Sequence, residues 1–181
     1  YNVAFGAYAL DADTMGSQTT AIGYGALSAQ NFTTATNSLN TAVGYLAGLS
    51  VTTGTSNTLI GGLAGDAQTD ASNSTAVGYS ALGANTTGSN NTAIGKEALD
   101  ANTEGSENVA VGVGALGAQT TSTDNVAVGV NAGLSITTGI RNTILGRSAG
   151  DALTDADDNV AVGQQSLSSD TLGSGAVAIG H

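Results

Sequence analysis

The sequence predicts an all-β fold, a parallel β-solenoid of about ten stacked rungs. Three observations lead to this prediction. A phrase of the form Asn-x-Ala-x-Gly returns at a fixed interval, as at Gly78, Gly95 and Gly112, the residues within it alternate with period two, and the chain is rich in glycine (27) without any proline, cysteine or tryptophan. A sequence repeat this regular is typical of an extended surface or a rod rather than of a single active site.

The glycine of the phrase marks each rung. Successive marker glycines are evenly spaced, except that the interval from Gly23 to Gly44 is longer, so a four-residue insertion lies within 31–39. "AGLSVTTG" at 47–54 returns as "AGLSITTG" at 132–139, an offset of five repeats, which indicates that a block of five repeats was duplicated. Residues 1–181 are expected to form a single repeat domain with marker glycines Gly6, Gly23, Gly44, Gly61, Gly78, Gly95, Gly112, Gly129, Gly146, Gly163 and Gly180.

The columns of the repeat predict the strands of each rung. The residue before the marker glycine is always Val, Ile, Leu or Phe, the residue two places earlier is Val or Thr, and the one between them is Ala in nine of eleven cases. Alternation of β-branched residues with period two is typical of a short strand. A second alternating stretch, from an Ala three places after the glycine to a Thr five places further, predicts a second strand, and Gly, Ser, Asn and Asp then turn the chain back. A helix is excluded because the glycine and β-branched content is high and no 3.6-residue period is present.

The small size of the rung predicts self-association. Ten rungs at about 4.8 Å each give a rod roughly 50 Å long. A two-stranded rung encloses few side chains, and burial at about 25 cal/mol per Å² scarcely offsets about 1.5 kcal/mol of ordering per residue. One face of the first strand carries Val, Ile and Thr, and the other carries Ala and Gly. We expect the first face to fill the coil and the smooth Ala/Gly face to meet a neighbouring subunit that packs along its length.

Asparagine begins eight of the eleven phrases. Stacked in register, these amides would hydrogen-bond along the rod as a ladder; the alternative is that Asn only tolerates the turn. The expected ladder consists of Asn2, Asn40, Asn57, Asn91, Asn108, Asn125, Asn142 and Asn159.

These repeats resemble those of two groups of fibrous proteins. "NVAVG" at 108–112, followed by Ala-Leu, is similar to the head repeats of trimeric autotransporter adhesins of the YadA type, and "TAVGYSALGANTTGSNNTAIG" at 75–95 more closely resembles repeats of bacteriophage tail-fibre proteins. The resemblance covers essentially the whole chain. It implies a left-handed parallel β-roll and a homotrimer around a common axis. The 17-residue repeat is longer than that of the adhesin heads, so the second strand or its turn is expected to differ.

The resemblance also implies a function. The chain is expected to be a structural and adhesive rod, the shaft of a phage tail fibre or the head of a trimeric adhesin, located outside the cell on a virion or a bacterial surface. Its partners would be further copies of itself and a host cell-surface receptor or glycan. Because it starts at Tyr1, we expect it to be a fragment of a longer protein whose flanking domains cap the rod. One alternative is an extracellular filament subunit that stacks end to end, and a more distant one is an ice-binding solenoid, although only one regular Thr column is present where ice-binding faces pair two.

Composition argues against several other classes. A net charge of −11 with three basic residues disfavours nucleic acid or an anionic membrane as partner. No apolar run approaches the roughly 20 residues that cross a bilayer, so membrane insertion is not expected. No enzymatic activity and no cofactor are expected, because the acids lie in regular columns and no tryptophan is present to bind a sugar. The G-x-G-x-x-G match at 112–117 has no βαβ unit around it.

Two weak site candidates remain. The acidic residues are spaced along the rung columns, which is typical of a solvated face that keeps the rod soluble. The alternative is weak Ca²⁺ or Mg²⁺ binding between Asp151, Asp155, Asp157 and Asp158. In the insertion, Phe32 is a candidate receptor contact, because recognition is often carried by loops on rigid scaffolds; the alternative is a tolerated bulge.

Overall fold

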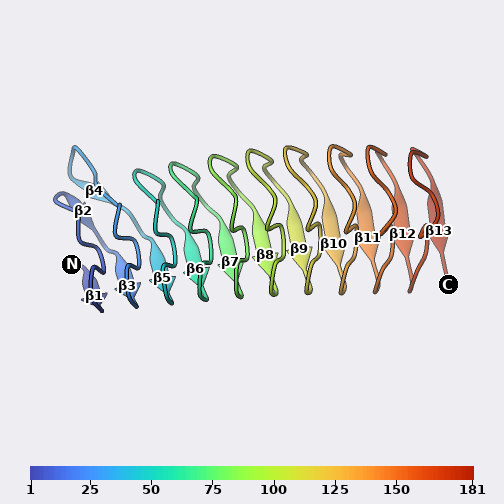
Figure 1. Cartoon of the computed structure of the whole chain (residues 1–181). Helices are drawn as coiled ribbons and strands as arrows, with labels where there is room; N and C mark the ends of the chain where they lie inside the picture. The colour runs from blue at the N-terminus through green and yellow to red at the C-terminus, as the bar shows by residue number, and fades with distance from the viewer.

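The computed structural model describes residues 1–181 and shows a rod with the two termini at opposite ends (Figure 1). The chain forms no helix, and one short strand recurs in each rung, so the predicted parallel β-solenoid is confirmed. Eleven of these strands form one parallel sheet along the side of the rod. They are Val3–Phe5 (β1), Thr20–Ile22 (β3), Thr41–Val43 (β5), Thr58–Ile60 (β6), Thr75–Val77 (β7), Thr92–Ile94 (β8), Val109–Val111 (β9), Val126–Val128 (β10), Thr143–Leu145 (β11), Val160–Val162 (β12) and Val177–Ile179 (β13).

The register of the sheet aligns the columns of the repeat. Ala93 of β8 lies beside Ala110 of β9, its equivalent in the next regular repeat, and Ala21 of β3 lies beside Ala42 of β5 across the longer interval. The insertion therefore leaves the main sheet in register. Within this longer interval Thr36–Asn37 (β4) pairs with Gly16–Ser17 (β2) as a small two-stranded sheet near the N-terminal end (Figure 1).

The second strand predicted for each rung is absent, apart from that two-residue pair. After the marker glycine the chain bends instead, because the residues two and four places further on have φ near +55°, as in Glu97 (+57°) and Leu99 (+52°). Two left-handed residues so close together cannot continue a strand, and the stretch runs as turns. Of the Ala, Leu and Thr residues that suggested a strand, the Ala and Leu are buried in the coil, as in Ala98 and Leu99, whereas the Thr residues lie at the surface between rungs.

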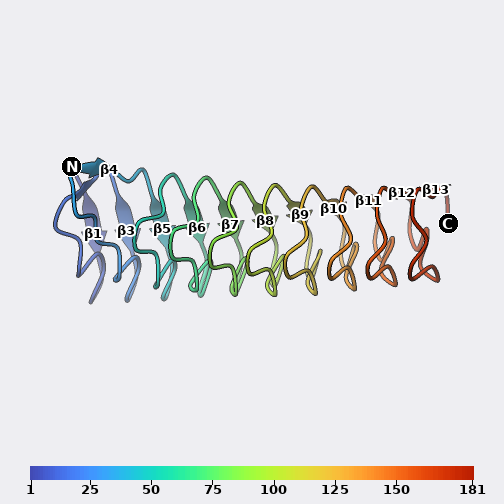
Figure 2. The ribbon, with the colours of Figure 1, turned by 90° about the horizontal axis from the view of Figure 1, so that it is seen from above.

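Hydrogen bonds between the turns hold the rungs together as much as the sheet does. Of 113 backbone hydrogen bonds, 21 lie within the strands and 92 elsewhere. In one rung, Glu97 N donates to Tyr79 O of the preceding rung (2.9 Å), while Leu99 N donates to Ala115 O of the next (3.0 Å). Figure 2 shows these turns stacked side by side along the whole rod. The backbone N–H and C=O groups of a rung are therefore all hydrogen-bonded only when the rung has neighbours on both sides.

The interior is filled by alanine from the strands and leucine from the turns, which corrects the predicted orientation of the sheet. The central residue of each inner strand points into the coil and is fully buried; it is Ala in all of them except β6 and β11, as in Ala93 and Ala110. Val, Ile and Thr on either side point outward. Leu99 and Leu116, four places after their marker glycines, are also fully buried. The thin coil holds one large side chain from the turn, which leaves only the volume of a methyl group on the strand side.

Where the turn leucine is absent, other core positions are larger. Gly150 takes the place of this leucine, and an added Cβ there would lie 2.9 Å from Ile144 Cδ1 and 3.0 Å from Leu153 Cδ1. Ile144 replaces the usual strand alanine, and Leu153 replaces the polar residue found in most rungs seven places after the marker glycine. Exchanges of this kind conserve core volume, as tolerated core changes generally do.

One buried side chain breaks this pattern and carries a prediction. Gln68 is fully buried, and neither its Nε2 nor its Oε1 has a hydrogen-bond partner. Its counterpart in the second five-repeat block is Leu153. We expect Gln68→Leu to raise the free energy of unfolding by about 1–3 kcal/mol, because an unpaired buried amide is replaced by an apolar group.

Gln119, in the same column, is the matched control. Its Nε2 donates to Ser122 O (3.1 Å) and its Oε1 accepts from Asn125 Nδ2 (3.2 Å), so Gln119→Leu is expected to destabilise the chain. Denaturant unfolding of both variants measures the two changes in the free energy of unfolding, which are expected to have opposite signs. A Gln68→Leu protein no more stable than the unchanged chain would contradict the prediction.

The asparagine column forms a hydrogen-bonded ladder inside the rod, interrupted at Thr19 and Ser74. Asn142 N donates to Asn125 Oδ1 (2.8 Å), and Asn159 N donates to Asn142 Oδ1 (3.0 Å). Except at Asn159, the amide Nδ2 also reaches across its own coil, as from Asn125 to Gly139 O (2.7 Å). The equivalent bond across the coil is made by Asn2, Asn40, Asn57, Asn91, Asn108 and Asn142. These residues join both neighbouring rungs and the two sides of one rung, a role beyond tolerance of a turn.

Candidate interaction surface

The sheet presents an apolar face to solvent along the whole rod. We call the first and third residues of the eleven strands the outward face; they are Thr or Val and then Val, Ile, Leu or Phe. Ile60, Ile94 and Leu145 are 39%, 41% and 46% exposed, although each lies in a strand with a neighbour on both sides. Eleven three-residue strands cover roughly 48 Å by 10 Å, about 500 Å². Its third residues form an unbroken column of Val, Ile, Leu and Phe, while six of its first residues are Thr. This face is therefore a candidate interaction surface.

Two columns of side chains border this face. The leading column comprises the residue two places before each strand from β3 on: Gln18, Leu39, Ser56, Asn73, Asn90, Glu107, Asp124, Arg141, Asp158 and Gly175. The trailing column comprises the residue two places after each strand up to β12: Ala7, Tyr24, Tyr45, Gly62, Tyr79, Lys96, Val113, Val130, Arg147 and Gln164.

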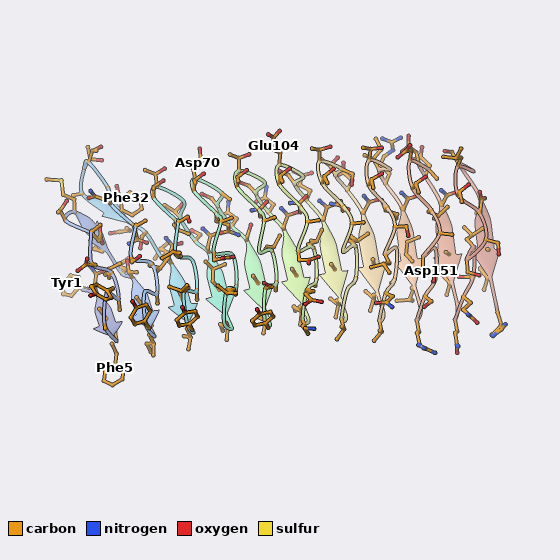
Figure 3. The ribbon with its side chains drawn as sticks, in the orientation of Figure 1. Tyr1, Phe5, Phe32, Asp70, Glu104 and Asp151 are labelled. Carbon is orange, nitrogen blue, oxygen red and sulfur yellow. The ribbon has the colours of Figure 1, made fainter.

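Three tyrosines lie in the N-terminal half of the trailing column, and Tyr8 lies beside it. The rings of Tyr24 and Tyr45 are stacked, with centroids 5.7 Å apart and an interplanar angle of 18°, and Tyr8 meets Tyr24 edge-on at 5.5 Å. All three rings remain exposed. Figure 3 shows Phe5 of the outward face projecting at the same edge, beyond the end of β1. Together with the outward face, these rings extend the apolar surface at this end of the rod.

Charge is divided between the two columns. The trailing column contains Lys96 and Arg147 and no acid, whereas the leading column contains three acids and Arg141. Within the leading column Arg141 Nε and Nη2 donate to the two carboxylate oxygens of Asp158 (2.6 and 2.9 Å), which lowers the pKa of that carboxyl. Lys96 Nζ lies 3.2 Å from Glu97, with both side chains exposed, and Arg147 makes no ion pair within the chain.

The four acidic residues considered for a cation are dispersed. No three acidic or histidine side chains gather in a way that would hold a metal ion. Asp155 accepts hydrogen bonds from the hydroxyls of Thr137 and Thr138 (2.9 Å each), Asp157 accepts from Ile140 N (2.8 Å), and Asp158 pairs with Arg141. Asp70 and Glu104, which share a column with Asp155, lie at the tips of the loops, away from Asp151 (Figure 3).

Phe32 lies inside the insertion rather than on its surface. Its side chain is only 6% exposed, so the ring is not presented to a receptor in this conformation. Next to it a buried polar network continues the asparagine ladder, in which Asn40 Nδ2 donates to Gln30 Oε1 (2.8 Å) and Gln30 Nε2 donates to Asp13 Oδ2 (3.2 Å). Leu39, which is 54% exposed, is the apolar side chain that the insertion presents to solvent.

The threonine column forms a second seam between rungs. The hydroxyl of Thr86 donates to Thr103 O (3.0 Å), and that of Thr103 donates to Thr120 O (3.1 Å). The same bond recurs at Thr52, Thr69, Thr120, Thr137 and Thr154. These hydroxyl hydrogens are used within the rod, which leaves the column less suited to ordering water.

Two partly buried carboxylates predict a pH dependence. Burial raises the pKa of Asp66 and of Asp100 above the usual 3.8, and Glu97 adds to the effect at Asp100. A pKa that is raised by folding favours the folded state below pH 3.8, and this contribution is lost as the pH rises through the folded-state value. Asp100→Asn is therefore expected to raise the melting temperature at pH 7 and to leave it unchanged at pH 3. The gain is less than about 1 kcal/mol because the side chain keeps contact with water.

Asp158→Asn is the control of opposite sign. The pKa of Asp158 is lowered by Arg141, so its contribution is present at neutral pH and is lost as the pH falls. Thermal melts of both variants at pH 7 and at pH 3 measure the two changes in melting temperature. An Asp100→Asn protein that melts lower than the unchanged chain at pH 7 would contradict the assignment.

The rest of the surface contains little concavity. The one cavity lies at the C-terminal end of the rod, between 165–167 and 178–181. The structure contains no helix with the length and hydrophobicity needed to span a membrane. Comparison with models of protein families, with curated proteins and with solved structures finds no match to this chain.

Proposed function

We propose that the chain is a structural and adhesive rod of an extracellular surface fibre, the shaft of a phage tail fibre or the head of a trimeric adhesin. Three copies pack around a common axis, and each turns its outward face toward that axis. The observation that supports this proposal is the column of Val, Ile, Leu and Phe, the third residue of each strand, which runs along the outward face from β1 to β13. The resemblance of "NVAVG" and its repeats to fibre proteins agrees with it.

Stability arguments favour the same arrangement. The core of one chain consists of alanine with one larger residue in most rungs, which is little burial for 181 ordered residues. Burial of the outward face of each copy would add apolar area where the single chain lacks it. The strands lie side by side along the rod, so three faces meeting at an axis give a stiff shaft of constant cross-section.

Receptor contact then falls to the loop tips. The tips carrying Asp70 and Glu104 lie beyond the starts of the strands, at the edge of each rung opposite the turns that follow the strands (Figure 3). They present Thr, Asp and Glu at one-rung intervals. A repeated polar surface of this kind suits many weak contacts with a cell-surface glycan or receptor, whose avidity exceeds that of any single contact.

Two lysine substitutions in one rung test the role of the outward face. Val111→Lys places a charge on this face, whereas Thr121→Lys places the same charge at the exposed tip of the same rung. Sedimentation velocity is expected to show a three-chain species for Thr121→Lys and its loss for Val111→Lys, because three ammonium groups would be buried close together. A Val111→Lys protein that keeps the same mass would overturn the proposal. Large species of variable length in both variants would instead indicate end-to-end filaments.

A further inference from the structure

The two columns that border the outward face match each other in charge and position. We propose that neighbouring copies pack side by side in parallel, with the trailing column of one copy along the leading column of the next. In this arrangement Lys96 faces Glu107 of the next copy, and Arg147 faces Asp158 of the next copy. The proposal rests on the side-by-side assembly above and adds its direction, its register and the residues that set them.

Both columns change from uncharged to charged side chains at the same position along the rod. In the N-terminal half the trailing column has the tyrosines Tyr24, Tyr45 and Tyr79, and the leading column there carries no charge from Gln18 to Asn90. In the C-terminal half the trailing column has its two cations, and the leading column has Glu107, Asp124, Arg141 and Asp158. Parallel packing therefore places rings against uncharged side chains and cations against acids.

Antiparallel packing would lose this match, because each column would then meet the same column of the other copy. Glu107 and Asp124 would lie toward the uncharged half of the other leading column, and Lys96 and Arg147 would lie in a contact between two trailing columns, which contain no acid. Burying a charge without an opposite charge beside it is costly. Charge complementarity of this kind selects between orientations more than it adds affinity.

A single register satisfies both ion pairs. Lys96 follows β8 and Glu107 precedes β9, while Arg147 follows β11 and Asp158 precedes β12. Each acid thus lies one rung, about 4.8 Å, further along the rod than its cation, which extended Lys and Arg side chains can span. The same offset brings Tyr79 toward Asn90.

The contact area also requires the two columns. The strands alone give about 500 Å² per copy, which is below the roughly 800 Å² per partner of a stable interface. Adding the two columns widens the contact to at most about 23 Å, the length of seven fully extended residues, which over about 48 Å of rod gives an upper limit of roughly 1,100 Å². The columns therefore complete an interface that the outward face alone leaves too narrow.

Disulfide trapping tests the register, because the chain contains no cysteine of its own. Lys96→Cys with Glu107→Cys places one thiol in each column. Within one chain the two columns lie about 20 Å apart across the sheet, far beyond disulfide reach. Oxidation is expected to give covalent dimers and trimers and no larger species. The control pair, Lys96→Cys with Gln164→Cys, places both thiols in the trailing column and is expected to stay uncross-linked.

The native mass of the same samples separates the two proposals. A three-chain mass without a Lys96–Glu107 cross-link, or with a cross-link in the control pair, would overturn the register and leave the trimeric rod standing. A one-chain mass would overturn both proposals.

Charge exchange tests the Lys96–Glu107 pair without disulfides. Lys96→Glu is expected to raise the concentration at which the assembly dissociates by roughly tenfold. Adding Glu107→Lys should restore it. Failure of this rescue, in a protein that keeps its β-sheet circular dichroism, would count against the pairing.

Discussion

Gly61→Ala is expected to abolish the folded rod, or to lower its free energy of unfolding by more than about 4 kcal/mol. Gly61 has φ of +135°, a region that residues with a Cβ do not adopt without strain. An added Cβ would lie 2.7 Å from the Gly78 carbonyl carbon and closer still to its oxygen. Every inner marker glycine meets the next in this way, so the effect cannot be absorbed by moving one rung. Thermal unfolding followed by circular dichroism measures it.

The neighbouring glycine provides the control. Gly62 does not have a positive φ, and a Cβ there would meet Tyr79 Cδ2 at 3.7 Å and Tyr45 O at 3.9 Å, which are ordinary contacts. Gly62→Ala is expected to be neutral or stabilising by up to about 1 kcal/mol, because it restricts the unfolded chain. Equal losses in the two variants would show that the marker position has no special role.

Asn125→Ala is expected to cost roughly 3–5 kcal/mol, since each buried group left without a partner costs about 1–3 kcal/mol. The substitution removes the bond from Asn125 Nδ2 to Gly139 O (2.7 Å) and the acceptor of Asn142 N (2.8 Å). It also removes the acceptor of Asn142 Nδ2 (3.1 Å). Denaturant unfolding of the variant measures the loss.

Ser74→Asn tests the same ladder in the opposite direction. Ser74 interrupts the asparagine column, and its Oγ accepts from Asn91 N at a long 3.4 Å. An asparagine there would place an amide within reach of Gly88 O, the equivalent of the carbonyl Gly105 O that Asn91 reaches. We expect a gain of about 1 kcal/mol. A loss at Ser74→Asn together with little change at Asn125→Ala would mean that the ladder does not stabilise the rod.

The repeat makes the solenoid fold predictable from the sequence, but the residues after the marker glycine predict a second strand that does not form. The spacing of Gly95 and its equivalents sets the rung length, and alternation around Ala93 sets the strand. The alternation after the glycine wrongly predicts a second strand because a sequence does not show that Glu97 and Leu99 adopt positive φ. Leucine rarely does so, and here burial of the side chain in the thin coil offsets the strain.

The same leucines explain why the strand pattern alone assigns the interaction surface to the wrong face. When only the strand is considered, the small Ala and Gly residues suggest a face that a neighbouring subunit could approach closely. Because Leu99 occupies the coil, only a residue as small as Ala93 fits beside it, and Ile94 points outward. Phe32 is expected to be exposed because it lies in an insertion, but its ring fills the loop.

A search of the sequence for alternation with period two does not find the leading and trailing columns, because these residues lie in turns. A signal for them is present in the sequence, since Lys96 and Arg147 share one column and Glu107 and Asp158 share another. Their position beside the outward face depends on the turn geometry, which only the structure supplies.

The mass of the unmodified chain in solution bears on the trimeric rod without any substitution. Light scattering coupled to size exclusion across a dilution series is expected to give one species of three times 17.4 kDa at every concentration. A stable single-chain mass at every concentration would rule the trimer out, because the outward face would then be a solvated surface and the thin core sufficient by itself.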